Sequence, residues 1–264
     1  MKFKYLIGAF AALTFMSSCK EDDNPQTNEP TAQNAEVILY YDFKFGDDDF
    51  ALNQNFTTDN GEVVKFTLAT YYLSKPAIMD DAGGMTMLDP EYYIIRPDVM
   101  MSKMGSIEPG HAHMFNVSIG LDEATNTEDG TSGVQPTDFS DANHPLAPQP
   151  EGMYWSWASG YIFVKIEGEV DNDGDGTFDN TFKYHLGTND FRKDRSTMLH
   201  SDVAAGDTVA VTMTVDYKEF FNGVDLETEI LTMSMGDARP LGVKMMNQFD
   251  AATSFSKGGG HDHN

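Results

Sequence analysis

The stretch YIFVKIEGEVDNDGDGTFDNTFKYHLG, residues 161–187, has the clearest structural pattern in the chain. Apolar and polar residues alternate on both sides of its acidic centre, in YIFVKIEGEV (161–170) and NTFKYHLG (180–187). A repeat of two indicates a β-strand, because successive side chains of a strand point to opposite faces. The Asp- and Gly-rich centre, DNDGDGTFD (171–179), is typical of a turn. The stretch therefore predicts two strands joined as a hairpin.

The same repeat of two recurs along most of the chain. β-Branched and aromatic runs lie between clusters of Gly, Asp, Asn and Pro, at 35–45, 61–74 and 207–221. Only the region near 217–226 predicts a helix or a turn-rich segment. The pattern predicts an all-β protein, an antiparallel β-sandwich with long loops at 121–150 and 187–207. Loops of that length in a compact domain are usually functional or disordered.

The N-terminus, MKFKYLIGAFAALTFMSSC (1–19), combines a cationic start, an apolar run and small residues before a cysteine. This pattern indicates a secretion signal, and the apolar run is short for a membrane span. Cys19 is the single cysteine of the chain, so it cannot form an internal disulfide. MSSC resembles a bacterial lipobox, and the KEDD that follows resembles the tag of surface-exposed lipoproteins of Bacteroidetes-type bacteria. We expect Cys19 to be lipidated in an outer-membrane lipoprotein exposed at the cell surface; the alternative is an ordinary signal peptide.

The rest of the chain divides by composition. Residues 20–35 contain almost no large apolar side chain and predict a disordered tether. Residues 36–255 are long enough for one β-sandwich domain. Residues 256–264, which end in GGGHDHN, predict a flexible tail.

The chain is strongly acidic, with a formal net charge of −25 at pH 7. Such a charge excludes nucleic acid as an expected partner and favours cationic partners or metal ions. The sequence has no GxSxG stretch, Walker loop or HExxH motif. We therefore expect that the protein is not an enzyme.

The acidic turn at 171–179 is a candidate calcium site. Its carboxylates alternate around glycines and belong to Asp171, Asp173, Asp175 and Asp179. Hard oxygen ligands around a tight turn suit calcium, and the stretch resembles the loops of thrombospondin type 3 repeats. The alternative is an acidic turn that only keeps the hairpin tip soluble.

Two further segments carry paired histidines. His111 and His113 lie in MMSKMGSIEPGHAHMF (100–115), whose methionines Met100, Met101, Met104 and Met114 add thioethers. Imidazole with thioether suits copper, but an apolar strand with a polar edge has the same composition. In the tail, His261 and His263 could capture a transition ion weakly, or belong to a segment without a site.

Both tryptophans of the chain, Trp155 and Trp157, stand one residue apart in GMYWSW (152–157). In a strand they would share a face, as core packing or as a stacking platform. His144 precedes them in a Pro-rich run, and His185 lies on the second strand of the predicted hairpin.

Several segments in order resemble the MbnP-like copper-binding family, the methanobactin-associated proteins. They are NQNFTTDNGEVVKFTLATYYLSKPAIMDDAGG (53–84), FNVSIGLDEATN (115–126), HPLAPQPEGMYWSWASGYIFVKIEG (144–168) and FKYHLG (182–187). The resemblance implies a secreted all-β protein that binds copper through histidine and a tryptophan oxidised to kynurenine. It implies Trp155 or Trp157 as the oxidised residue, His144 and His185 as candidate copper ligands, and a di-haem cytochrome c peroxidase-like protein as partner.

Two functions remain open from the sequence. The first is a surface-anchored protein that binds copper in copper acquisition or handling. The alternative is a calcium-stabilised β-sandwich interaction module that binds glycan or protein through its tryptophans, without copper.

Overall fold

The computed structural model describes residues 33–126, 133–156 and 159–259. The chain divides into two units, residues 1–31 and 32–264, and the described residues all lie in the second. The first strand begins at Ala35 and the last ends at Lys257. The elements are β1 (Ala35–Phe45), β2 (Asp48–Asp49), β3 (Asn55–Thr57), β4 (Val63–Met79), β5 (Met85–Met87), β6 (Tyr92–Ile95), β7 (Met101–Ile107), β8 (Gly110–Ile119), β9 (Tyr154–Ser156), β10 (Gly160–Tyr161), β11 (Val164–Asp171), β12 (Asn180–Leu186), β13 (Lys193–Val203), β14 (Thr208–Asp216), α1 (Tyr217–Phe220), β15 (Leu231–Thr232), α2 (Arg239–Ala252) and β16 (Thr253–Lys257).

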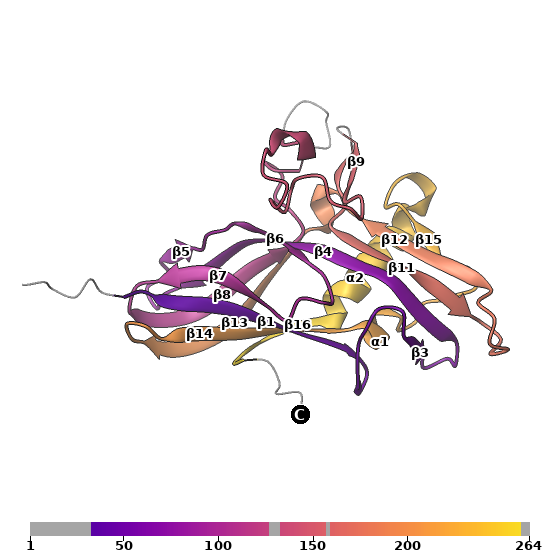
Figure 1. The fold of residues 1–264 in the computed structure, drawn as a ribbon, viewed down its shortest axis with the longest axis horizontal. Helices are drawn as coiled ribbons and strands as arrows, with labels where there is room; N and C mark the ends of the chain where they lie inside the picture. Colours follow the sequence, from indigo (N-terminus) through magenta and orange to yellow (C-terminus); the bar gives the residue numbers. More distant parts are fainter. Residues whose placement is uncertain (1–32, 127–132, 157–158, 260–264) are drawn as a thin grey trace, which may run out of the picture. The chain divides into compact units, whose positions relative to one another are not determined.

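Within the described residues, the strands form a five-stranded, a nine-stranded and a two-stranded sheet (Figure 1). The five-stranded sheet has the order β16-β14-β1-β2, with β7 also paired to β1. The nine-stranded sheet has the order β13-β8-β4-β11-β12-β15, and β3, β5 and β6 pair with the long strand β4. The all-β sandwich is confirmed. Most pairs are antiparallel, but β1 pairs with β14, and β12 with β15, in parallel.

The core lies between the two large sheets. Val37 and Leu39 of β1 belong to the same buried cluster as Phe66 and Phe115 of the nine-stranded sheet. Aromatic rings join the layers, with Phe45 and Phe66 6.3 Å apart between centroids. Burial of this kind is the main source of stability in a β-sandwich, and the sheets are therefore a fixed support for the loops at their ends.

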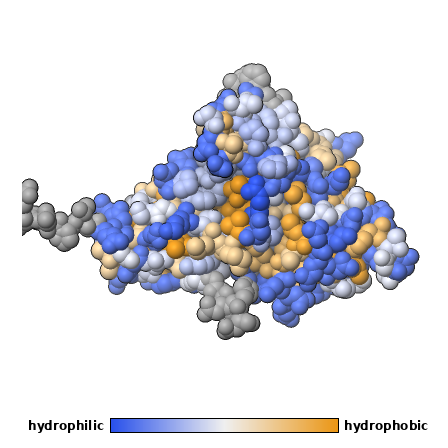
Figure 2. All heavy atoms as spheres, in the orientation of Figure 1, coloured by the Kyte–Doolittle hydropathy of each residue, from blue (hydrophilic) through white to orange (hydrophobic). Residues whose placement is uncertain are grey.

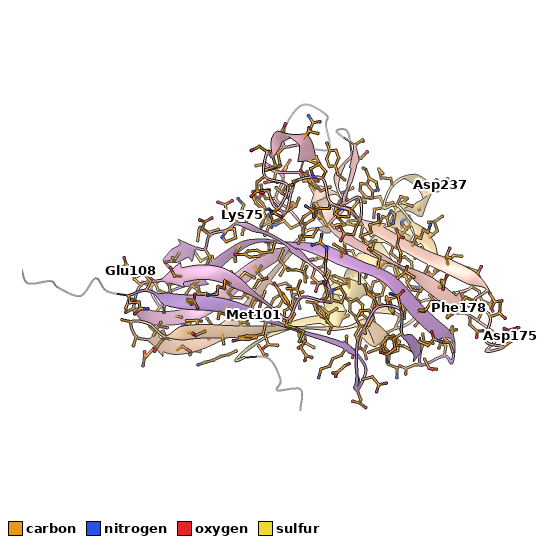
Figure 3. All side chains as sticks on the ribbon, viewed as in Figure 1. Lys75, Met101, Glu108, Asp175, Phe178 and Asp237 are labelled. Atoms are coloured by element: carbon orange, nitrogen blue, oxygen red, sulfur yellow. The ribbon has the colours of Figure 1, made fainter. Side chains whose placement is uncertain are left out.

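The hairpin prediction is confirmed. β11 pairs antiparallel with β12, in a register that places Val170 opposite Asn180, and the acidic turn joins them. Asp175 and Phe178 mark the hairpin tip at one end of the unit, and Glu108, in the β7–β8 turn, lies at the opposite end (Figure 3).

Two elements differ from the expectation. The predicted loop at 187–207 contains the strand β13, in which only Leu199 and Val203 are buried, so its sequence lacks an apolar repeat. The 14-residue helix α2 was not predicted, because Pro240 and Gly242 near its start weaken the helical pattern. Proline is tolerated in a first helical turn, and the buried face of α2 packs Phe249 against Tyr71 of β4. The helix near 217–226 is confirmed as α1, and the described part of 121–150 is a loop with one short 3₁₀ turn.

Polar side chains cover most of the face shown in Figure 2, with hydrophobic patches between them. In the described residues, no helix has the length and apolar character needed to cross a membrane.

Candidate metal-binding sites

The ring of Trp155 packs against the end of β12. A Cβ built on Gly187 would lie 2.9 Å from Cζ3 of Trp155 and 2.5 Å from the carbonyl oxygen of Tyr161, so only glycine leaves room for the indole. The Nε1 atom of Trp155 is buried and has no hydrogen-bond partner among the described residues. The hydroxyl of the adjacent Tyr154 is also buried and also lacks a partner there. Buried polar groups are rarely left unpaired, so this segment is an exception that calls for an explanation.

His185 is oriented as a metal ligand would be. Its Nε2 lies 2.6 Å from Oε1 of Glu167 on the neighbouring strand β11, and its side chain is 12% exposed. When Nε2 donates to the carboxylate, the neutral ring keeps its lone pair on Nδ1. Burial lowers the pKa of His185 and outweighs the opposite effect of Glu167. A carboxylate that fixes a neutral imidazole is a common second partner of metal-bound histidine.

His144 is arranged differently. Its Nδ1 accepts a hydrogen bond from the backbone N–H of Leu146, and its ring stacks on Phe139 with centroids 4.0 Å apart. Burial lowers its pKa, so the ring is neutral at pH 7 with its proton on Nε2. Binding a metal ion through Nε2 would require that proton to move to Nδ1 and would end the contact with Leu146. The described geometry therefore favours His185 over His144 as a ligand.

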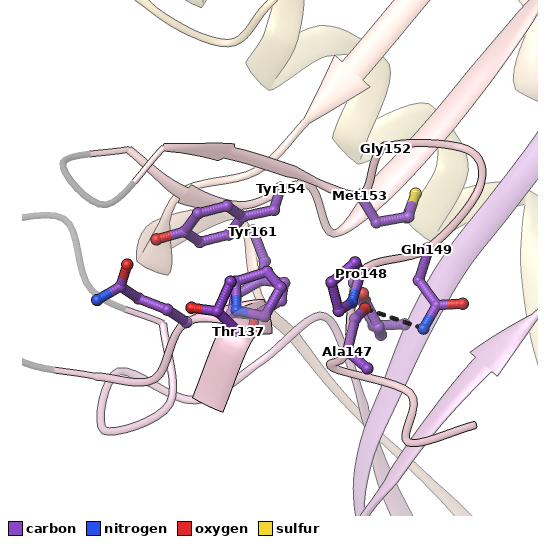
Figure 4. A pocket seen from close by; sticks show the side chains of 11 residues that line it. Thr137, Ala147, Pro148, Gln149, Gly152, Met153, Tyr154 and Tyr161 are labelled. Atoms are coloured by element: carbon purple, nitrogen blue, oxygen red, sulfur yellow. Dashed lines mark hydrogen bonds between the residues drawn. The ribbon is translucent and has the colours of Figure 1, made fainter. Parts of the chain in front are cut away.

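A pocket of about 270 Å³ adjoins the tryptophan strand (Figure 4). Tyr154 and Tyr161 form one wall, with ring centroids 4.9 Å apart, and Met153 lies on the other side. The side chain of Gln149 donates to the carbonyl oxygen of Pro145 at 3.0 Å and holds the loop that closes the pocket. The tryptophan segment therefore lies beside a pocket that is lined by aromatic rings and partly open to solvent.

His111 and His113 lie on β8, and the structure brings them together with Asp81 and His200, which were not predicted as site residues. The ligand atoms of these four side chains all lie within 4.8 Å of one another. The predicted thioethers are dispersed: Met104 is fully buried in the core, Met100 and Met101 are exposed at the start of β7, and Met114 follows His113 on β8.

The acidic turn forms a second group, which contains Asp171, Asp173 and Asp179 but not Asp175. Asp171 is 3% exposed, and its two carboxylate oxygens accept hydrogen bonds from the backbone N–H groups of Gly174 (2.7 Å) and Gly176 (2.9 Å). The turn is thus held by its own hydrogen bonds, and the calcium site stays a prediction.

Among the described residues, neither of these two groups contains His144 or His185. Trp157, Cys19, His261 and His263 lie outside the described residues. His200 could not be selected from sequence, because its place beside His113 depends on the register between β8 and the unpredicted strand β13.

These features define an all-β sandwich with histidine and carboxylate groups that could hold a metal ion. The chain belongs to the MbnP family, whose model matches residues 34–236. The solved structure of MbnP from Methylosinus trichosporium is similar to it, with a TM-score of 0.55 and 14% sequence identity. That match covers 85% of this chain and 99% of that chain, and at this identity it shows a shared fold. A comparison with curated proteins gave no match.

Proposed function

We propose that this protein binds copper through histidine and an oxidised tryptophan, in copper acquisition or handling. Membership of the MbnP family supports a copper-related role. The structural observation that carries the proposal is the buried indole nitrogen of Trp155, which has no hydrogen-bond partner among the described residues. Its ring lies at the end of the strand that bears His185.

An unpaired buried donor costs about 1–3 kcal/mol. Packing alone gives no reason to accept that cost, because a phenyl ring would fill an apolar site without a donor. Oxidation of Trp155 to kynurenine would replace the fused indole by an aniline with a free amino group and a ketone. Both new groups are polar, and His185, two residues before Gly187, supplies an imidazole whose Nε2 is held by Glu167. In this proposal Trp155 is oxidised, His185 is the main imidazole ligand, and Trp157 and His144 are the other candidates.

The oxidant in this proposal is a di-haem cytochrome c peroxidase-like partner that withdraws four electrons from the tryptophan. Two water molecules supply the oxygen atoms that open the indole to N-formylkynurenine, and a third water releases formate and leaves kynurenine. The protein is proposed to be an outer-membrane lipoprotein, anchored through Cys19 and exposed at the cell surface. Replacing Cys19 by alanine should release it from membranes, and unchanged membrane partitioning would contradict the anchor.

The decisive experiment is peptide-mapping mass spectrometry of the protein extracted from the membranes of its own host. We expect the peptide that spans residues 153–165 to carry the mass of kynurenine at Trp155 or Trp157. Two unmodified tryptophans in that peptide would refute the oxidation.

Copper titration of the same material tests the ligand. His185→Gln should weaken copper binding by at least about tenfold, since an imidazole donor is lost. Thr181→Gln is the control, because Thr181 is exposed and lies four positions earlier on the same face of β12. Equal copper affinities in the two variants would show that His185 is not a copper ligand.

A calcium-stabilised interaction module is the second candidate. It is favoured by the close approach of the Asp171, Asp173 and Asp179 carboxylates at the hairpin tip. Tryptophans that are unmodified, together with a calcium-dependent rise in melting temperature, would favour this function over copper handling.

A further inference from the structure

We propose that Asp81, His111, His113 and His200 form a second, separate site for a divalent transition-metal ion, zinc or copper(II). We call these four residues the edge cluster. They come from three places in the sequence: the β4–β5 turn, the start of β8, and β13. None of them belongs to the tryptophan segment or to the acidic hairpin.

The contacts within the edge cluster are close. The rings of His113 and His200 meet edge to face with centroids 4.4 Å apart, and the ring of His111 is 6.2 Å from that of His200. Oδ1 of Asp81 lies 2.8 Å from Nδ1 of His113 and 3.7 Å from Nε2 of His111. One carboxylate oxygen thus lies within reach of two imidazoles, and the third imidazole packs on one of them.

A local irregularity of β13 places the third imidazole. Met198 pairs with Met114 and Ser201 pairs with Ala112, so Leu199 and His200 together lie opposite the single residue His113. His200 has a φ of +43°, in the left-handed region that a residue with a side chain seldom adopts. Such a conformation is strained and persists where the surroundings enforce it, often at functional sites. Here Nζ of Lys257 on β16 donates to the carbonyl oxygen of His200 at 3.3 Å and helps to hold the strained residue.

A further carboxylate orients His111. Oδ1 of Asp202 lies 2.8 Å from Nδ1 of His111, and this arrangement leaves Nε2 directed toward Asp81. A carboxylate on one ring nitrogen with the other nitrogen free is the usual support of a metal-bound histidine. Asp202 is therefore a positioning residue, and His111 needs little rearrangement to bind.

The donor set selects the ion. Three imidazoles and one carboxylate suit zinc or copper(II), whereas calcium and magnesium require oxygen ligands and copper(I) prefers sulfur. Around a tetrahedral zinc ion the donors would be about 3.3 Å apart. The donors of the edge cluster, within 4.8 Å of one another, could reach that separation by small rotations of side chains that are partly exposed. The net charge of −25 favours the approach of a cation.

The test is isothermal titration of the purified full-length chain with zinc and, separately, with copper(II). The background variant replaces His261 and His263 by alanine, so that tail imidazoles cannot contribute. We expect one saturable zinc or copper(II) equivalent that His113→Ala removes and that His200→Asn weakens at least about tenfold. Asparagine tolerates the left-handed conformation, so His200→Asn should keep the fold, as a melting curve would verify. Asp194→Asn on the same strand is the control and should bind as the background does.

Binding of zinc alone or of copper(II) alone supports the site and identifies its ion. Zinc and copper(II) stoichiometries that are the same in His113→Ala, His200→Asn and the background would overturn it. This result is independent of the tryptophan chemistry, because the edge cluster needs no kynurenine. A protein with unmodified tryptophans can still carry the edge cluster, and failure of one proposal is therefore distinguishable from failure of the other.

Discussion

Replacing Gly187 by alanine should disturb the packing of the tryptophan segment. The added Cβ would lie 2.5 Å from the carbonyl oxygen of Tyr161 and 2.9 Å from Cζ3 of Trp155. The backbone of Tyr161 cannot retreat easily, because its N–H donates to Oδ1 of Asn126 at 2.7 Å. The indole must therefore move. Overpacking of this kind costs about 1–3 kcal/mol.

The assay is chemical and thermal unfolding, followed by tryptophan fluorescence. In a domain of this size each kcal/mol corresponds to a fall of about 2–4 °C in melting temperature. Gly187→Ala should lower the melting temperature and shift the emission of the folded state, since the indole changes its surroundings. Gly110→Ala is the control, because a Cβ there meets nothing within 4 Å. Unchanged stability and emission in Gly187→Ala would refute the packing that we describe around Trp155.

Three further predictions concern the loops. The hydrogen bond from Arg96 lowers the pKa of Glu151, so this contact should stabilise the fold above the ordinary pKa of glutamate, about 4.3, and lose its effect as the pH falls through the lower pKa of the folded state. The stability of Glu151→Gln should therefore differ most from that of the wild type near neutral pH and approach it in acid unfolding curves. A stability difference that is constant with pH would contradict this. Asp171→Ala should destabilise the protein by about 1–3 kcal/mol in the presence of a chelator, because two backbone donors lose their buried acceptor. Equal denaturation midpoints for the variant and the wild type would show that the turn does not depend on this carboxylate. Calcium should raise the melting temperature of the wild type and raise it less in Asp173→Asn, whereas no shift in either would leave the turn as a hydrogen-bonded loop without an ion.

The sequence predicted the strands whose buried side chains form a continuous or alternating pattern along the chain. β1 was expected at 35–45 and spans Ala35–Phe45, because its side chains form a continuous run buried between neighbours. The β11–β12 hairpin was equally visible, since a strong turn signal separates two alternating segments. By contrast, β13 pairs through its backbone while only Leu199 and Val203 are buried, so its hydropathy pattern does not indicate a strand.

The sites show the same limit. His111 and His113 were selected because a spacing of two is a local property. Asp81 and His200 were not, since their approach depends on the pairing of β8 with β4 and with β13, and on the register shift in β13. The burial of the Trp155 nitrogen, which has no partner in the part of the chain that the structure describes, and the contact between His185 and Glu167 depend likewise on the way the strands come together.

The register shift in β13 also has a consequence for the evolution of the protein. A strand with one extra residue opposite His113 differs from a regular strand by a single inserted codon. Because β13 is the outermost strand on the path β13-β8-β4, that insertion alters only one row of pairing and leaves the strand order and the central aromatic core as they were. A third imidazole can thus be gained or lost at the border of the sheet without redesign of the fold. We expect relatives with a regular β13 to lack the edge cluster while keeping the tryptophan segment.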